Sequence, residues 1–536
     1  MPLPLLLSVF LIPSISIPFV YLVGKKSAKW AAIFVALISL ANIMLVLSTV
    51  PSVLNNGTHR YVETYTWITA PNISFTLFTD GISASIALVS LVLILVAALF
   101  SINYMAGKKH LPVYYALLAM LSVGLVGVFI TSNFILFYLC WELMLVPAYF
   151  IVGEWGYKDS YKQAFKLFIW THAGAVFVLL GLGAIYIFSG SADMFTAQYW
   201  LATNAAGTSL VQWAIIALTA GFAVKMAVLP VHLWLPDAHS EAPAPMSALL
   251  SGVIISAGAY AILRLSLGMV FPAVGATFGT NFLHGLAIVG LLSAFFGSFV
   301  ALVSTDIKRL IAYSSIAHMG YIMFGLSLFP TSVLTGTAVI LVSSIAIVGT
   351  VMHIISHALS KGLLFLSAGG IMHQTEKRDI RTMGGLASKM PFTAVSSTIA
   401  ALSIGGAPPF ACFISEFLIF VGAFDVMRTD SFYVWPTALM LVATVFSLAY
   451  MLRFVSYIFF GQPKDANGQV IPDAAEEPAH GGHGNEPATE TKEGGHAGLD
   501  VPNYIKLSFA ILVVLVVIVG IYPSFFIHLI QTVSMG

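Results

Sequence analysis

Residues 137–147 read F-Y-L-C-W-E-L-M-L-V-P, a run of apolar side chains that contains one carboxylate, Glu142. A charged side chain at the centre of a bilayer costs about 3 kcal/mol or more, so it is expected to have a partner and a function. Three further apolar runs contain Lys225, Lys361 and Glu416. Acids and bases placed through the middle of a membrane protein predict that it moves protons or other ions.

The composition is that of a membrane protein. Hydrophobic residues make up 59% of the chain and charged residues 8%, with a mean hydropathy of +0.95, whereas soluble chains carry about a quarter charged residues. The formal net charge of +1 gives no indication of nucleic-acid binding. Cys140 and Cys412 lie in apolar runs and are expected to be buried hydrophobes, not a disulfide or a metal pair. The first apolar run lacks the features of a cleavable signal and should stay as a membrane helix.

Runs of about 20 apolar residues mark transmembrane helices. We therefore predict an all-α polytopic membrane protein with about fourteen spans, of which 332–371 is too long to be straight and should bend. The spans lie at 3–23, 29–50, 78–103, 112–131, 133–153, 166–189, 210–235, 247–271, 282–304, 309–329, 332–371, 391–427, 433–460 and 503–531.

Two spans are predicted to be broken helices. Gly405, Gly406 and the following prolines should divide 391–427 into two halves, and Pro230 and Pro236 should stop the seventh span. A membrane tolerates a broken helix only where the freed backbone groups meet protein or water. Such breaks therefore point to a transport site.

The distribution of Lys and Arg tests this count independently, because cytoplasmic loops carry an excess of both. With the N-terminus outside, the outer loops contain only Arg60 and Arg428. Both termini are therefore predicted outside. The basic residues of the predicted cytoplasmic loops are Lys25, Lys26, Lys29, Lys108, Lys109, Lys158, Lys162, Lys166, Lys308, Arg309, Lys377, Arg378, Arg381, Lys389, Lys464 and Lys492.

The spans also predict an internal repeat. Helices four to eight and helices nine to thirteen each contain a broken fourth helix, and an odd number of spans inverts the second set relative to the first. Inverted repeats with broken helices at matching positions are common in ion-coupled transporters. The predicted segments are 1–111 with three helices, 112–271 and 272–460 with five helices each, a His/Glu/Gly-rich cytoplasmic loop at 461–502, and 503–536 with the last helix. The loop is expected to be flexible, and its glycine-rich spacing preorganises no metal site.

Glu142 and Lys225 are the first candidate pair. At a separation of about 6 Å and an effective dielectric constant near 20, they would interact by about 2.5–3 kcal/mol. Burial and a nearby carboxylate act on a lysine in opposite directions, so a lysine balanced between them can release its proton when the glutamate moves. The alternative is a static ion pair that holds two helices together, and the sequence leaves both open.

His353, His357 and Lys361 recur every four residues in V-M-H-I-I-S-H-A-L-S-K-G and so form one polar stripe on a helix. Imidazole both accepts and donates a proton, so the stripe suits a proton relay that His318 and Glu416 would extend. The alternative is that the histidines are hydrogen-bonded to neighbouring serines or carbonyls.

The loop L-P-D-A-H-S-E-A-P follows the first broken helix and contains Asp237, His239 and Glu241. It is a candidate for proton uptake or, alternatively, a capping turn, for which Asp237 after a proline is suited. His172 and His232 are weaker candidates for the relay. The sequence has no nucleotide fingerprint, P-loop, C-x-x-C pair or haem signature, so we expect no redox centre in this chain.

Four phrases resemble the antiporter-like subunits of respiratory complex I, and most of all the subunit M group. They are W-E-L-M-L-V-P-A-Y-F, A-V-K-M-A-V-L-P-V-H-L-W-L-P-D-A-H-S-E-A-P, D-I-K-R-L-I-A-Y-S-S-I-A-H-M-G and S-E-F-L-I-F. The resemblance covers nearly the whole chain. It implies a proton-translocating module in which Glu142 and Lys225 are the coupling pair, His318 and His357 belong to the relay, and Glu416 ends it.

The resemblance also implies partners and a location. Other membrane subunits and the lipid bilayer would surround this chain. Quinone and NADH, or an equivalent donor such as a deazaflavin or ferredoxin, would be used by the whole complex, with no cofactor bound by this chain. The location would be a prokaryotic plasma membrane. The alternatives are a subunit of a Na⁺/H⁺ antiporter, the membrane arm of a hydrogenase, and a passive scaffold.

One position departs from the subunit M pattern. Where that group has a central lysine in a phrase shaped like L-L-K-x-x-x-Y, this chain has V-I-I-S-A-G-A-Y, and Ser256 takes the place of the lysine. A serine carries no charge at neutral pH. Lys361 resembles the lysine of subunit L and of membrane-bound hydrogenases, so we expect it to supply the central base that Ser256 cannot.

Overall fold

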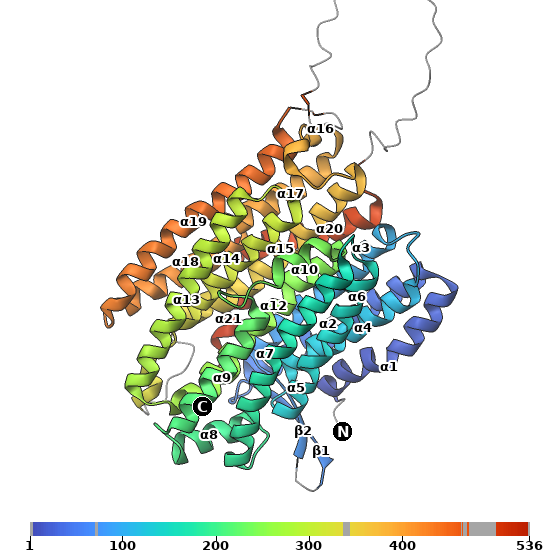
Figure 1. The fold of residues 1–536 in the computed structure, drawn as a ribbon. Coiled ribbons are helices and arrows are strands. Elements are labelled where there is room, and N and C mark those ends of the chain that lie inside the picture. Colours follow the sequence, from blue (N-terminus) through green and yellow to red (C-terminus); the bar gives the residue numbers. More distant parts are fainter. Residues whose placement is uncertain are drawn as a thin grey trace, which may run out of the picture.

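The computed structural model describes residues 4–69, 73–335, 344–462, 464, 469–470 and 500–533. In this part of the chain thirteen helical segments are long and apolar enough to cross a membrane, and they lie side by side in one bundle (Figure 1). The all-α polytopic fold is confirmed. The segments are α1 (Leu5–Lys26), α2 (Ala28–Asn55), α3 (Gly81–Tyr104), α4 (Leu111–Ile130), α5 and α6 (Phe134–Leu143 and Leu145–Trp155), α7 (Ser160–Ser189), α9 (Ser209–Met226), the run Ala244–Ala273 with α11 (Ala244–Leu249) and α12 (Ile255–Ala261), α13 (Ala276–Val303), α14 (Ile307–Ser327), α15 (Ile345–Thr375), the run Ser431–Phe460 around α19 (Val434–Val455), and α20 (Asn503–Ile521). Shorter helices are α8 (Met194–Asn204), α16 (Leu386–Lys389) and α21 (Ser524–Gln531).

The predicted span at 391–427 is divided, as its glycines and prolines indicate. It consists of α17 (Pro391–Ile404) and α18 (Ala411–Val426), and each half is shorter than the about 20 residues that a straight crossing needs. Gly406 lies between them with φ of +68°, a conformation that glycine adopts without steric cost. A Cβ at this position would also lie 2.6 Å from a carboxylate oxygen of Glu416. The break therefore brings backbone directly against a titratable side chain.

The seventh span is also interrupted. Helix α9 ends at Met226, and the short helix α10 (Leu235–Glu241) begins after an unwound segment. The backbone amide of Leu229 donates to Ser293 Oγ over 3.0 Å, and the carbonyl of Val224 accepts from the Trp234 indole over 2.9 Å. Polar groups freed by the break thus meet protein, as the membrane environment requires.

The predicted bend in 332–371 falls partly outside the described residues, which leave out 336–343. Before these residues the chain forms a 3₁₀ turn at Thr331–Thr335, and after them α15 runs without interruption from Ile345 to Thr375. The polar stripe of the sequence therefore lies on one continuous helix.

Equivalent helices of the two predicted repeats make equivalent contacts. In the first set α7 packs against α9, and in the second α15 packs against α18. Both contacts are close because a glycine lies at each: a Cβ on Gly221 would lie 2.5 Å from the carbonyl oxygen of Gly174, and one on Gly349 would lie 2.6 Å from the amide nitrogen of Ile419. Small residues let membrane helices approach one another. This recurrence supports two repeats. The boundaries of the five predicted segments of the chain, from 1–111 to 503–536, stay a prediction.

A β-hairpin, which the sequence did not lead us to expect, connects α2 and α3. Strands β1 (Tyr61–Ile68) and β2 (Ile73–Thr79) pair antiparallel. The Glu63 carboxylate accepts hydrogen bonds from the amides of Leu6 and Leu7 at the start of α1, where the helix dipole favours negative charge. The hairpin therefore fixes the first helix to the body.

The start of α1 and the helix α21 lie at the same end of the bundle. The hairpin binds the start of α1, and α21 packs on the start of α3, where a Cβ on Gly81 would overlap the carbonyl of Leu529. The placement of both termini outside rests on the Lys and Arg distribution and stays a prediction.

A buried ion pair joins the hairpin end of α3 to the helical run Ala244–Ala273. Asp80 caps α3 by accepting from the amides of Ile82 and Ser83, and its other oxygen lies 2.7 Å from Arg264 Nη2. Their side chains are 0% and 4% exposed. Removing one partner of such a pair leaves an uncompensated buried charge, which costs more than the pair contributes as a whole.

We predict that Arg264→Met destabilises the protein by about 3–5 kcal/mol. The matched control is Arg428→Met, because Arg428 pairs with Asp425 on the surface with side chains 82% and 75% exposed, where an ion pair contributes about 0–1 kcal/mol. Thermal unfolding of the purified membrane protein measures both. Equal midpoints for the two variants would contradict a structural role for the buried pair.

Candidate functional site

The predicted polar stripe lies in the core of the second repeat. His353, His357 and Lys361 are all fully buried on α15, and His318 on α14 is buried against them. The rings of His318 and His353 stack with centroids 5.3 Å apart, and that of His357 lies 5.6 Å from His318. The structure therefore brings the four predicted residues together.

One end of the cluster is hydrogen-bonded across three helices. His318 Nδ1 lies 3.1 Å from His353 Nε2, and His353 Nδ1 lies 2.9 Å from Ser415 Oγ on α18. The next residue, Glu416, places Oε1 4.0 Å from His318 Nδ1. The carboxylate of Glu416 is thus a close neighbour of the two imidazoles, although it does not hydrogen-bond to either of them.

A chain of hydroxyl groups continues from the same cluster. Tyr450 of α19 places its hydroxyl 3.4 Å from His318 Nε2 and 3.1 Å from Ser447 Oγ, which lies 3.4 Å from the hydroxyl of Tyr321. Nothing in the sequence marked these residues, because their position beside His318 depends on the packing of α14 against α19.

Lys361 is held by neutral oxygens. Its Nζ donates to Ser314 Oγ and to the carbonyl of Ile311 on α14, the latter over 3.2 Å. No carboxylate oxygen of the described residues lies within 4.0 Å of this nitrogen. The ammonium is therefore not fixed by an ion pair.

His357 and His239 are buried imidazoles whose two ring nitrogens both lack hydrogen-bond partners in the part of the chain that the structure describes. His239 stacks on Phe365 of α15 with ring centroids 4.6 Å apart. Its burial, together with the charges of Lys308 and Lys361, holds the pKa of His239 well below its usual value. Buried polar groups are normally satisfied by protein or water, so we expect water to hydrogen-bond to these two rings.

The predicted pair of Glu142 and Lys225 is not a direct ion pair. Lys225 Nζ donates to the carbonyl of Trp141 over 2.8 Å and lies 3.9 Å above the Trp141 ring. Glu142 turns away and lies 3.0 Å from Nδ1 of His172 on α7. Glu142 and Lys225 thus share no hydrogen bond, and His172, a weaker candidate in the sequence, is the partner of the carboxylate.

Glu142 and His172 are partly exposed on the outer face of the bundle, with side chains 26% and 49% exposed. The surrounding side chains of this face are apolar, among them Leu139, Ile169 and Val176. A titratable pair in the middle of apolar spans has no reason to face lipid. This face therefore has to be covered or hydrated.

The three residues of the candidate uptake loop have different surroundings, and their role in proton uptake stays a prediction. Asp237 pairs with Lys166 over 2.7 Å and with Arg309 over 2.8 Å. Glu241 lies 3.8 Å from Arg378, and only His239 is buried in the interior. Asp237 is not the N-cap of α10, because the helix begins at Leu235 and Asp237 lies in its first turn. The acids belong to an ion-pair network at the basic end of the bundle.

Ser256 takes no part in the cluster. Its hydroxyl donates to the carbonyl of Gly252 one turn earlier, over 2.8 Å. The residue lies where its helix meets Ile354, Ile355 and Ala358 of α15, beside a small gap. The hydroxyl of Ser256 thus forms its hydrogen bond within its own helix.

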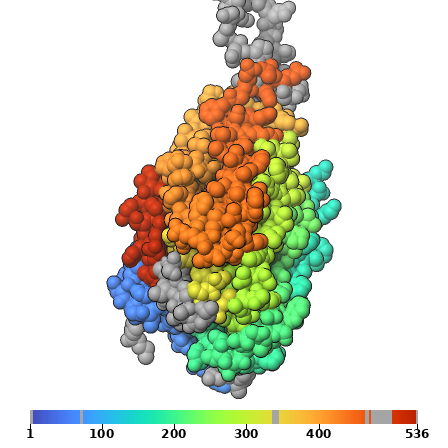
Figure 2. All heavy atoms as spheres, turned by 90° about the vertical axis from the view of Figure 1, so that its left-hand side faces the viewer, coloured from blue at the N-terminus to red at the C-terminus, as the bar shows by residue number. Residues whose placement is uncertain are grey.

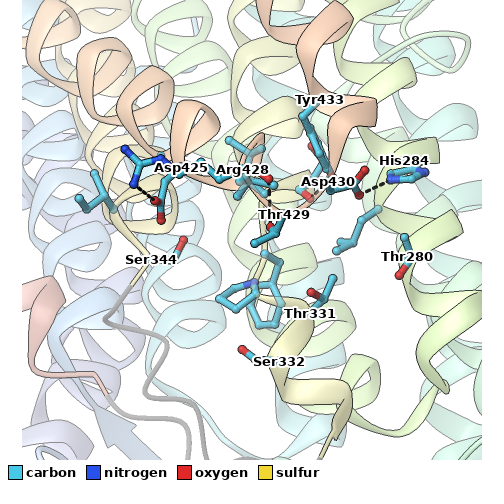
Figure 3. A pocket seen from close by; sticks show the side chains of 18 residues that line it. Thr280, His284, Thr331, Ser332, Ser344, Asp425, Arg428, Thr429, Asp430 and Tyr433 are labelled. Atoms are coloured by element: carbon cyan, nitrogen blue, oxygen red, sulfur yellow. Dashed lines mark hydrogen bonds and ion pairs between the residues drawn. The ribbon is translucent and has the colours of Figure 1, made fainter.

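Two cavities lie near the second repeat. One of about 440 Å³ is lined by Glu416 among apolar side chains such as Phe417 and Leu441, on the flank of α18 and α19 that faces the viewer in Figure 2. The other, of about 660 Å³, is lined by His284 and Asp430, whose side chains bond over 2.7 Å, and Figure 3 shows the two side by side at one edge of the pocket. The larger cavity contains none of the predicted relay residues, whereas Glu416 lines the smaller one.

Comparison with known proteins shows which family this chain resembles. The family model described as NADH:quinone oxidoreductase/Mrp antiporter, TM, matches residues 131–447. NADH-quinone oxidoreductase subunit M of Rickettsia conorii is 32% identical over 464 residues, with 85% of this chain and 88% of that one covered. Subunit M of Escherichia coli K12 is 33% identical over 405 residues, covering 74% of each chain.

Solved structures share the fold over nearly the whole chain. A chain of the Mrp complex from Dietzia sp. has a TM-score of 0.80 and 21% identity, with 99% of this chain and 97% of that one covered. A chain of respiratory complex I from Thermus thermophilus has a TM-score of 0.77 and 20% identity, with 98% of each covered. The fold is that of the antiporter-like membrane subunits. The chain belongs to the NADH:quinone oxidoreductase/Mrp antiporter transmembrane family.

Proposed function

We propose that this chain is a proton-translocating membrane subunit of a complex I-like NADH-quinone oxidoreductase, in which electrons travel to quinone through other subunits. Curated relatives named NADH-quinone oxidoreductase subunit M, at about a third identity over most of the chain, support the assembly. The observation that carries the proton chemistry is the buried contact of His318, His353 and Glu416 from three different helices. Neutral imidazoles that touch one another can pass a proton by accepting it on one nitrogen and donating it from the other.

The proposed row runs through both repeats. It starts at Glu142 and His172, continues through Lys225 near the first broken helix, and reaches the cluster around Lys361 by way of water at the unpartnered imidazoles. Glu416 beside the second broken helix ends it. Because the buried lysines are held by carbonyl and hydroxyl oxygens, a change in the charge of one neighbour is enough to change whether they keep a proton.

The ends of the row lie on two different flanks of the bundle, which supports neighbouring subunits as partners. Glu142 is partly exposed beside α7, and Glu416 lines a cavity on the flank of α18 and α19. Titratable groups in transmembrane segments are expected to face protein or water, not lipid. In the proposed assembly each flank is covered by another membrane subunit, so this chain is one link in a longer proton path in a prokaryotic plasma membrane.

A Na⁺/H⁺ antiporter subunit is the second candidate, and the name of the matching family and the Mrp complex structure favour it as much as they favour the first. The site chemistry favours protons, because hard cations prefer a shell of oxygen ligands, whereas the central cluster offers imidazole nitrogens with one carboxylate. Purification of the native assembly separates the candidates. Iron–sulfur and quinone-binding subunits support the oxidoreductase, and their absence with small antiporter subunits present overturns it.

We predict that Lys361→Met abolishes proton translocation while the complex still assembles, because the row then lacks its central base. The control is Ser256→Ala, which should pump normally because its hydroxyl bonds only within its own helix. Protons moved per electron in reconstituted vesicles measure both variants. A normal ratio in Lys361→Met would show that this lysine is not part of the path.

We predict that a cysteine at Ile169 crosslinks to a neighbouring membrane subunit, because Ile169 is 49% exposed beside His172. The natural cysteines, Cys140 and Cys412, are buried and leave the new thiol as the reactive one. The control is Leu37→Cys, 56% exposed on α2, where no titratable group requires cover. Attachment of a photoactivated crosslinker to the new thiol in native membranes, followed by illumination and electrophoresis, tests this, because the crosslinker bonds to any chain that it contacts. A product from Leu37→Cys but none from Ile169→Cys would contradict a covered α7 flank.

A further inference from the structure

We propose that His318, His353 and Glu416 bind a divalent transition-metal ion such as Zn²⁺, and that the bound ion blocks the relay. The three side chains offer one ligand atom each, all within 4.8 Å of one another, and all three residues are buried. They come from α14, α15 and α18. The metal site itself stands on this geometry, whereas the block rests on the proposed function.

The distances suit a tetrahedral ion with small adjustments. Zinc bonds of about 2.0–2.1 Å to nitrogen and oxygen place neighbouring ligand atoms about 3.3 Å apart. His318 Nδ1 and His353 Nε2 are 3.1 Å apart, and Glu416 Oε1 is 4.0 Å from His318 Nδ1. The two nitrogens already have nearly the required spacing, and the carboxylate oxygen, 4.0 Å from one nitrogen and within 4.8 Å of the other, has to move by about 1–1.5 Å to complete it. The fourth position stays open for water.

The outer nitrogens of both histidines have hydroxyl partners. Ser415 Oγ lies 2.9 Å from His353 Nδ1, and the Tyr450 hydroxyl lies 3.4 Å from His318 Nε2. Histidines that bind metal almost always bond through their other ring nitrogen to such a group, which fixes the tautomer and the ring orientation. The structure thus contains the supporting contacts as well as the ligand atoms.

Glu416 provides an independent indication of a ligand. Its Oε1 is buried without a hydrogen-bond partner among the described residues, a state that costs more for a charged group than for a neutral one. A cation at this oxygen would satisfy it. The cavity of about 440 Å³ that Glu416 lines on the flank of α18 and α19 supplies a path by which an ion reaches the carboxylate.

Metal and protons would compete for the same atoms. A metal ion binds the deprotonated carboxylate and the neutral imidazole, and its binding releases protons. With His318 Nδ1 and His353 Nε2 coordinated, neither atom can accept or donate a proton, and transfer to Glu416 stops.

The test measures metal bound to the complete complex that contains this chain. After treatment with a chelator, the complex is dialysed against Zn²⁺ and its zinc content is determined by mass spectrometry. The wild type should bind one equivalent more than Glu416→Gln or His353→Gln. The matched control is His357→Gln, a buried histidine one turn along the same helix, which should keep that equivalent. Co²⁺ in place of Zn²⁺ should give the visible absorption of tetrahedral coordination in the wild type and in the control.

Two milder variants keep the test decisive if a ligand variant fails to assemble. Ser415→Ala and Tyr450→Phe remove only the outer contacts and should weaken zinc binding about 10–100-fold. Equal zinc content and affinity in the wild type, Glu416→Gln and Ser415→Ala would overturn the site, as would loss of the equivalent in His357→Gln. Proton translocation without zinc tests the proposed function separately: a complex that binds zinc here but does not pump keeps the site and refutes the function.

Discussion

Lipid offers ionisable side chains neither hydrogen bonds nor solvation, so each one in the membrane part of this protein needs a partner in protein or water. Asp80 and Arg264 meet this requirement with a buried ion pair over 2.7 Å. Lys225 and Lys361 meet it with carbonyl, hydroxyl and indole groups instead. The first arrangement fixes two charges as structure. The second leaves a proton on each lysine without a counter-ion to hold it there, which is the condition that a relay needs.

The broken helices and the glycine contacts help to provide these partners for the ionisable side chains. An intact helix uses its backbone polar groups internally, whereas a break presents them to neighbouring side chains and water. At the second break Gly406 brings backbone against Glu416, and close packing of α15 on α18 brings His353 to Ser415. The cluster therefore depends on small residues remote from its chemistry, because a larger side chain at the helix contacts would move the histidines apart.

Much of the fold could be predicted from the sequence. Apolar runs of sufficient length defined the spans, and Gly and Pro defined both breaks, because these signals are local. The four-residue spacing of His353, His357 and Lys361 placed them on one face for the same reason. The hairpin before α3 was missed, although Tyr61–Ile68 is rich in aromatic and β-branched residues, and Asp80 was missed as the partner of Arg264. Both features lie beside long apolar runs, and the assignment of transmembrane spans rested on those runs alone.

The sequence by itself determined which groups are present in the membrane and in what order along each helix, since hydrophobicity and periodicity are properties of neighbouring residues. Only the tertiary structure decided which groups touch. It turned Glu142 from Lys225 to His172, separated His239 from Asp237 and Glu241, and brought Tyr450 to His318. The reason is that these contacts join helices far apart in the chain, and the small residues at each helix contact set the distances between them.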